Sequence, residues 1–111
     1  MGEVPPRSLS EDEHSVVARL INLGGLKLTV PNLVVGKCEC GCASIDFEPN
    51  KAGPKVLVDG YGRTAAGIEV GVLLWGYESS LARLEVYMLG TDTGELPTPE
   101  SLHLGGSVRA S

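Results

Sequence analysis

The sequence predicts a small α+β domain in which one N-terminal helix packs on an antiparallel β-meander of about four to six strands. Two patterns indicate this class. Apolar residues recur at helical spacing over residues 10–23, and two later segments, 68–74 and 82–88, alternate strictly between apolar and other residues. Hydrophobic residues make up 42% of the 111 positions and charged residues 21%, which is typical of a folded chain rather than a disordered or membrane-spanning one.

The helix has a clear beginning and end. Ser10 and Glu13 form a capping box, in which each side chain bonds the other residue's backbone N–H. Gly24-Gly25 ends the pattern. We therefore expect a helix over 10–23, with one apolar stripe made of Val16, Val17, Leu20 and Ile21.

The two alternating segments predict a β-hairpin with its turn near 78–80. A three-residue turn sets the register, so that Val72 faces Val86 and Leu74 faces Leu84 across the ladder. The same register places Trp75 opposite Arg83, as a cation–π pair, and Tyr87 over Gly71.

The remaining elements are shorter. Residues 26–30 form a strand or a loop, and 33–35 and 43–48 form a hairpin through a turn at Cys40-Gly41. A strand at 56–58 ends at Asp59-Gly60, and 98–103 holds one helical turn that begins at Pro99. The middle region contains Gly60, Gly62 and Gly67. We interpret these glycines as turn residues, because their spacing does not match that of nucleotide-binding loops.

We expect three regions: a flexible lead over 1–9, a single domain over 10–103 and a disordered tail over 104–111. No apolar run reaches the roughly 18 residues of a membrane span, and the first residues lack the features of a signal peptide. The expected location is the cytoplasm. The net charge of −5 and the scattered basic residues argue against a nucleic-acid partner, and no membrane partner is expected.

All three cysteines lie in one cluster, Cys38, Cys40 and Cys42. Three thiolates can bind Zn²⁺, with Asp46, His14 or His103 as a fourth ligand. A turn at Cys40-Gly41 opposes this, because it points Cys38 and Cys42 to opposite faces. Free structural thiols are therefore the favoured interpretation, and metal binding and thiol-redox chemistry are the alternatives.

Other candidate sites are weaker. The chain contains neither G-x-S-x-G nor H-E-x-x-H, and both histidines are expected at the surface. Asp46 and Glu48 share a strand face and are interpreted as outward polar positions rather than as a carboxylate pair. Three aromatic residues either form a patch for a partner or, as we favour, flank the sheet beneath the helix; they are Trp75, Tyr77 and Tyr87.

Five segments carry a resemblance to known proteins: 38–47, 59–60, 69–74, 84–87 and 96–99. They are similar to a family of small bacterial proteins, common among actinobacteria, that has no assigned activity. The resemblance covers most of residues 10–103 and departs from the family at Ala43, where proline is expected. It implies an intracellular single domain with a helix before a β-meander, and it supplies no cofactor or catalytic residue.

The sequence thus predicts a small cytoplasmic binding or accessory protein without enzymatic activity, with an unknown protein partner and an undefined oligomeric state. One alternative is a metal-binding or thiol-redox protein that uses Cys38, Cys40 and Cys42, with zinc or a soft metal as the cofactor. A further alternative is an enzyme with a cysteine nucleophile.

Overall fold

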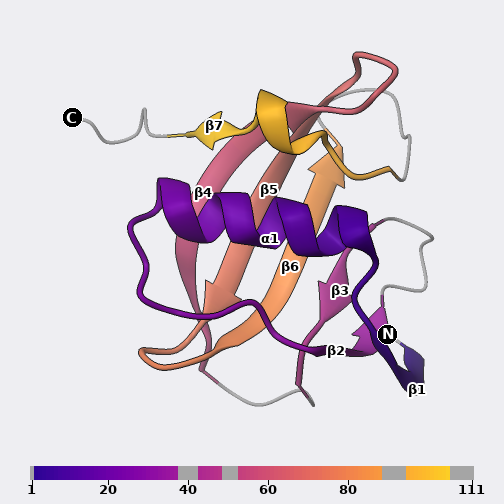
Figure 1. Cartoon of the computed structure of the whole chain (residues 1–111), viewed down its shortest axis with the longest axis vertical. Coiled ribbons are helices and arrows are strands. Elements are labelled where there is room, and N and C mark those ends of the chain that lie inside the picture. The colour runs from indigo at the N-terminus through magenta and orange to yellow at the C-terminus, as the bar shows by residue number, and fades with distance from the viewer. Residues whose placement is uncertain (1, 38–42, 49–52, 89–94, 106–111) are drawn as a thin grey trace.

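The computed structural model describes residues 2–37, 43–48, 53–88 and 95–105. In this part of the chain, one α-helix lies across a seven-stranded sheet in which every strand pair is antiparallel (Figure 1). The strand order is β1-β2-β3-β6-β5-β4-β7. The elements are β1 (Gly2–Ser8), α1 (Glu11–Leu23), β2 (Leu33–Lys37), β3 (Ile45–Asp46), β4 (Lys55–Arg63), β5 (Glu69–Gly76), β6 (Leu81–Met88), η1 (Pro99–Ser101, a 3-10 helix) and β7 (His103–Leu104).

The α+β class is confirmed, but the strand count and the simple meander are wrong. The sheet contains two three-stranded antiparallel units, β1-β2-β3, in which α1 connects β1 to β2, and the meander β4-β5-β6; the units meet where β3 pairs with β6 rather than with β4. The extra strands β1 and β7 lie at the two edges. They come from the ends of the chain, where the sequence pattern predicts no strand.

Helix α1 begins as predicted. Ser10 is the N-cap, and its side chain and that of Glu13 form the capping box. The apolar stripe is buried, since Val16, Val17 and Leu20 are all inaccessible to solvent and belong to the core cluster that includes the inward side chains of β4, β5 and β6. The helix is therefore held by its apolar stripe against the centre of the sheet.

The β5–β6 hairpin has the predicted register. Val72 lies opposite Val86, and Leu74 lies opposite Leu84. The ladder shifts by one residue after Trp75, and the turn is closed where the Tyr77 N–H donates to the Ser80 carbonyl over 2.8 Å.

The β2–β3 hairpin is confirmed in its pairing but not in its register. Lys37 lies opposite Ile45, whereas a two-residue turn at Cys40-Gly41 without a bulge would pair Lys37 with Ser44. Ser44 is held by β6 instead, because its hydroxyl accepts from the Val86 N–H over 2.8 Å. The predicted turn itself lies outside the described residues.

The predicted lead and tail are also corrected. Residues 2–8 form β1, which pairs with β2 and shifts register between Glu3 and Arg7. Pro5 and Pro6 fall within that interval, and an edge strand tolerates them because its outward positions need no N–H donor. At the other end, Leu104 belongs to β7, so the boundary predicted after residue 103 is wrong.

The chain does not turn at Asp59-Gly60, because β4 continues to Arg63. Gly60 and Gly62 are strand residues over which the C-terminal segment passes. A Cβ atom at Gly60 would lie 2.7 Å from the backbone oxygen of His103, and one at Gly62 would lie 2.9 Å from Pro97 Cβ. These two glycines therefore permit the close approach of η1 and β7 to β4.

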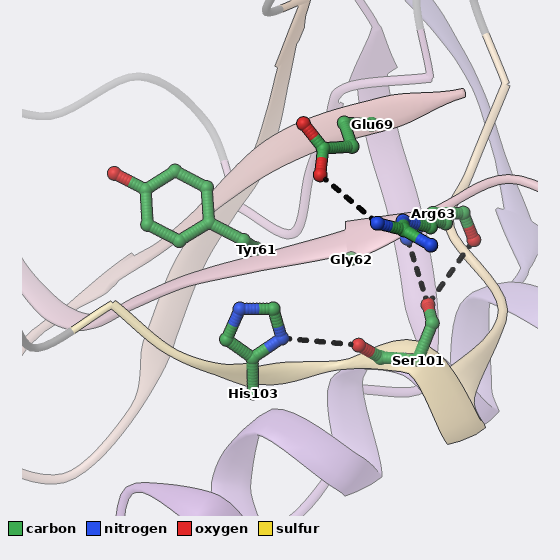
Figure 2. A pocket seen from close by; sticks show the side chains of 6 residues that line it. All are labelled: Tyr61, Gly62, Arg63, Glu69, Ser101 and His103. Atoms are coloured by element: carbon green, nitrogen blue, oxygen red, sulfur yellow. Dashed lines mark hydrogen bonds and ion pairs between the residues drawn. The ribbon is translucent and has the colours of Figure 1, made fainter. Parts of the chain in front are cut away.

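Only Gly67 has the positive φ (86°) expected of a turn glycine in this region. Ser101 then fastens the C-terminal segment to β4, since its hydroxyl accepts from the Arg63 N–H over 2.8 Å (Figure 2). The same hydroxyl lies 2.8 Å from the Thr98 carbonyl oxygen, to which it can donate.

We predict that Gly60→Ala lowers the free energy of unfolding by about 1–3 kcal/mol, because the added methyl group forces β7 away from β4. Hydrogen exchange should also show lost protection at the amide of Gly105, which donates to the Asp59 carbonyl over 2.7 Å. Ala66→Ser, in the exposed turn, serves as a control with little effect. Unchanged stability of the Gly60 variant would contradict the close approach.

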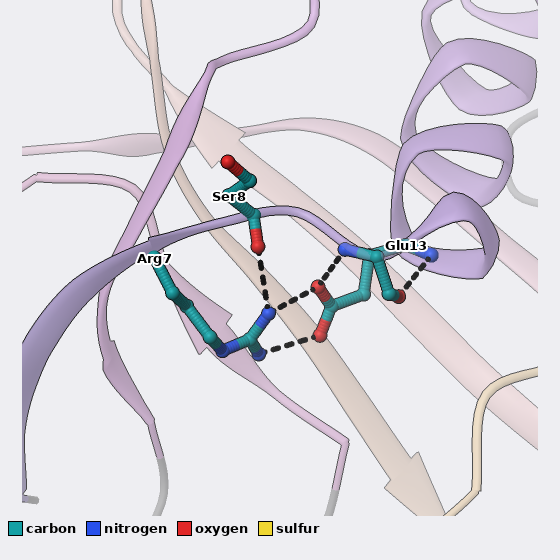
Figure 3. A network of polar contacts seen from close by, with 4 residues as sticks. Arg7, Ser8 and Glu13 are labelled. Carbon is teal, nitrogen blue, oxygen red and sulfur yellow. Dashed lines mark hydrogen bonds and ion pairs between the residues drawn. The ribbon is translucent and has the colours of Figure 1, made fainter.

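A buried carboxylate joins β1 to α1 (Figure 3). Arg7 donates two hydrogen bonds to Glu13, one to each carboxylate oxygen and each 2.9 Å long. The Ser10 N–H donates to the same carboxylate over 2.9 Å. These bonds lower the pKa of Glu13 from its ordinary value, with the Arg7 bonds as the largest cause and burial acting in the opposite direction.

We predict that Glu13→Ala lowers the free energy of unfolding at neutral pH by about 1–3 kcal/mol, since it removes charged hydrogen bonds and half of the capping box. Because the folded-state pKa is lowered, this stabilisation is complete above the unfolded pKa and is lost as the pH falls through the folded value. Urea unfolding should therefore show a smaller difference between variant and wild type in acid. Glu11→Ala, an exposed acid in the same turn, should cost only a few tenths of a kcal/mol; equal losses for the two variants would contradict this role of Glu13.

Candidate functional site

The sheet has a face that α1 does not cover. Side chains alternate along β5, so Val70, Val72 and Leu74 point to the helix while Leu73 and Trp75 point away from it. The 3-10 helix η1 contacts α1 and therefore lies on the helix side. We call the opposite side the open face; by register it carries Asp46, Asp59, Tyr61, Arg63, Glu69, Leu73, Trp75, Arg83, Glu85 and Tyr87.

Two tyrosines meet at the middle of the open face. Tyr61 and Tyr87 are the ladder partners of Gly71 on its two sides. The ring of Tyr87 lies over Gly71, as predicted, and occupies the space that a side chain there would need. Burial raises the pKa of the Tyr87 phenol, and the nearby Tyr61 and Asp59 raise it further, so this ring is neutral at physiological pH.

Polar contacts fix the side chains of the open face that lie nearer the β5–β6 turn. The indole N–H of Trp75 donates to Glu85 over 3.0 Å. Arg83 lies opposite Trp75, as predicted, but its Nε atom is 3.7 Å from a carboxylate oxygen of Asp46. The predicted cation–π contact between Trp75 and Arg83 is not found in the described structure. Trp75 is therefore fixed by a hydrogen bond, with its ring half-buried on the surface.

Tyr77 lies directly beyond the end of β5, at the opposite end of the hairpin from Tyr87. Burial, the charge of Glu48 and a hydrogen bond with Glu48 raise the pKa of the Tyr77 phenol. The favoured interpretation, that α1 covers these aromatic residues, is wrong for Trp75 and Tyr87 because α1 packs on the other face.

The carboxyl groups of Asp46 and Glu48 have different partners. Asp46 faces Arg83, whereas the charge of Glu48 acts on the Tyr77 phenol. Burial raises the pKa of Asp46 above its ordinary value, and the positive charge of Arg83 only partly opposes this. One oxygen of Glu48 is buried without a hydrogen-bond partner among the described residues. Neither carboxyl is a simple outward polar group, and no contact joins them as a catalytic pair.

A pocket of about 510 Å³ lies at the far end of β4 (Figure 2). Arg63 and Glu69 pair across one end of it at 3.3 Å. The rings of Tyr61 and His103 lie 6.0 Å apart, between centroids, at the other end. The lining residues are Tyr61, Gly62, Arg63, Glu69, Ser101 and His103. This pocket could not be predicted from local patterns, because its residues come from three separate segments of the chain. In the sequence, only the alternation of Tyr61 and Arg63 along β4 indicates that these two side chains share a side.

The predicted metal cluster falls on residues that the structure does not describe. Cys38, Cys40 and Cys42 lie outside the described residues. His14 is exposed on α1, whereas His103 lies on β7 at the opposite edge of the sheet from β2. Among the described residues, no group of three or more acidic, histidine or cysteine side chains is arranged to hold a metal ion.

Comparisons with protein families, with curated proteins and with solved structures found no match to this chain. Among the described helices, none has the length and apolar character needed to cross a membrane.

We predict that Asp46→Asn raises the free energy of unfolding at neutral pH by about 0.5 kcal/mol, the size typical of a half-buried, screened charge. The pKa of Asp46 is raised in the folded protein, so its ionised form costs stability above that pKa, and the cost disappears as the pH falls through it. Chemical denaturation at neutral and acid pH tests this. If the Asp46→Asn variant is instead less stable than the wild type at neutral pH, the Arg83 pair outweighs burial.

Proposed function

We propose that the protein is a non-enzymatic binding domain, located in the cytoplasm, whose open face docks a protein partner with a basic surface. The observation that carries this proposal is the row of half-buried aromatic side chains on a sheet face that no described helix covers: Tyr61, Trp75 and Tyr87. Tyrosine and tryptophan are enriched at the centres of protein interfaces, because each combines a large apolar ring with a polar atom.

Charge selects the kind of partner. The arginines on the open face already face acids, since Arg83 faces Asp46 and Arg63 faces Glu69. Asp59 and Glu85 flank the aromatic row and have no ion-pair partner among the described residues. A partner that presents lysine or arginine at these two positions gains attraction and faster association. A second copy of this chain, which carries a net charge of −5, would present the same negative charges instead.

The alternative of a metal-binding or thiol-redox protein stays a hypothesis, since it depends on cysteines outside the described residues. The metal content of protein purified without a chelator, together with its number of titratable thiols, addresses it separately from the docking proposal.

We test the docking proposal by affinity capture from the cells that express the protein. The double variant Asp59→Lys, Glu85→Lys should retain a basic protein at least about tenfold less well than the wild type does, because attraction becomes repulsion. The matched control Glu78→Lys, Glu100→Lys reverses two exposed charges away from the open face and should retain it like the wild type. The proposal is wrong if no captured protein depends on Asp59 and Glu85, or if the protein that does is acidic.

A further inference from the structure

The pocket at the end of β4 offers unused binding groups of both charges. Arg63 and Glu69 are 64% and 61% exposed and share a single contact of 3.3 Å between Arg63 Nη2 and Glu69 Oε2. A guanidinium has five N–H donors and a carboxylate has two acceptor oxygens. Most donors of Arg63, and the second oxygen of Glu69, therefore face the pocket or solvent.

The other polar groups of the pocket have assigned roles. The Ser101 hydroxyl fastens the C-terminal segment to β4, as described above. His103 Nδ1 lies 3.2 Å from the Ser101 carbonyl oxygen. A carbonyl oxygen can only accept, so Nδ1 carries the hydrogen and Nε2 is left as an acceptor in the neutral ring. The rings of Tyr61 and His103 lie next to each other, with an angle of 36° between their planes, and form one aromatic wall of the pocket.

We propose that this pocket binds a small zwitterion of the α-amino acid type that carries a flat side chain. The ligand carboxylate binds Arg63, in the geometry that guanidinium groups favour. The ligand ammonium group binds Glu69, and the flat side chain lies against Tyr61 and His103. The volume of about 510 Å³ is sufficient for such a ligand, since small-molecule sites occupy about 300–1,000 Å³.

A ligand with one charge fits less well. An anion that binds Arg63 also approaches Glu69 and the net negative charge of the chain, which is −5. A cation that binds Glu69 also approaches Arg63. Only a ligand with both charges gains from both members of the pair. This site shares Tyr61 with the docking surface but requires neither Trp75 nor the acids Asp59 and Glu85, so different variants test the two proposals.

The test is an NMR titration of the ¹⁵N-labelled full-length chain with three matched probes. L-phenylalanine carries both charges, 3-phenylpropionate carries only the carboxylate and phenethylamine carries only the ammonium group. L-phenylalanine should shift the amide signals of Gly62, Arg63, Glu69 and His103 saturably. Each one-charge probe should bind at least about tenfold more weakly, because one charged hydrogen-bonding group is lost.

Two variants show which side chain of the pocket binds each charged group of the ligand. Arg63→Gln should bind L-phenylalanine no better than phenethylamine, and Glu69→Gln should bind it no better than 3-phenylpropionate. Arg19→Gln, on the exposed side of α1, should behave as the wild type. The spectrum without ligand shows that each variant is folded. The proposal is overturned if L-phenylalanine causes no saturable shift at these amides, if the three probes bind the wild type equally, or if Arg19→Gln loses binding as the pocket variants do.

Discussion

The register of the β5–β6 hairpin decides what each face of the sheet can do. With Val72 opposite Val86, one face of both strands is aliphatic and accepts the apolar stripe of α1. The same register places Trp75 and Tyr87 together on the other face. Side chains alternate with a period of two, so a slip by one residue would bury the aromatic and charged side chains and expose the valines. That slip is excluded because it would expose the apolar side chains that are buried under α1. The open face, with its aromatic and charged side chains, follows from the register that is left.

A second constraint lies at the β4 edge. Because Gly60 and Gly62 have no side chains, η1 and β7 pack directly on β4, where Ser101 bonds Arg63. This contact brings His103 beside Tyr61 and thereby forms one wall of the pocket. The absence of two side chains is thus as important for the pocket as the residues that line it.

The two sides of the molecule differ in how well their charges are compensated. On the helix side, Glu13 is buried but accepts bonds from Arg7 and from the Ser10 backbone, which lower its pKa. On the open face, Asp46 is partly buried with a raised pKa, and the Nε atom of Arg83 is buried without a hydrogen-bond partner in the described part of the chain. Uncompensated polar groups cost stability, and proteins often retain them where a surface has a function. This contrast agrees with a binding role for the open face.

The local patterns of the sequence were sufficient for α1 and for the β5–β6 hairpin, because a capping box and strict alternation act over a few neighbouring residues. They were insufficient for β1, for β7 and for the course of β4 through Asp59-Gly60. A glycine in the sequence is equally compatible with a turn and with a close contact between distant segments, and only the packing of η1 and β7 distinguishes the two. The pocket likewise depends on tertiary structure. Arg63 and Glu69 are partners in the β4–β5 hairpin, but His103 joins them only because the C-terminal segment crosses the edge of the sheet.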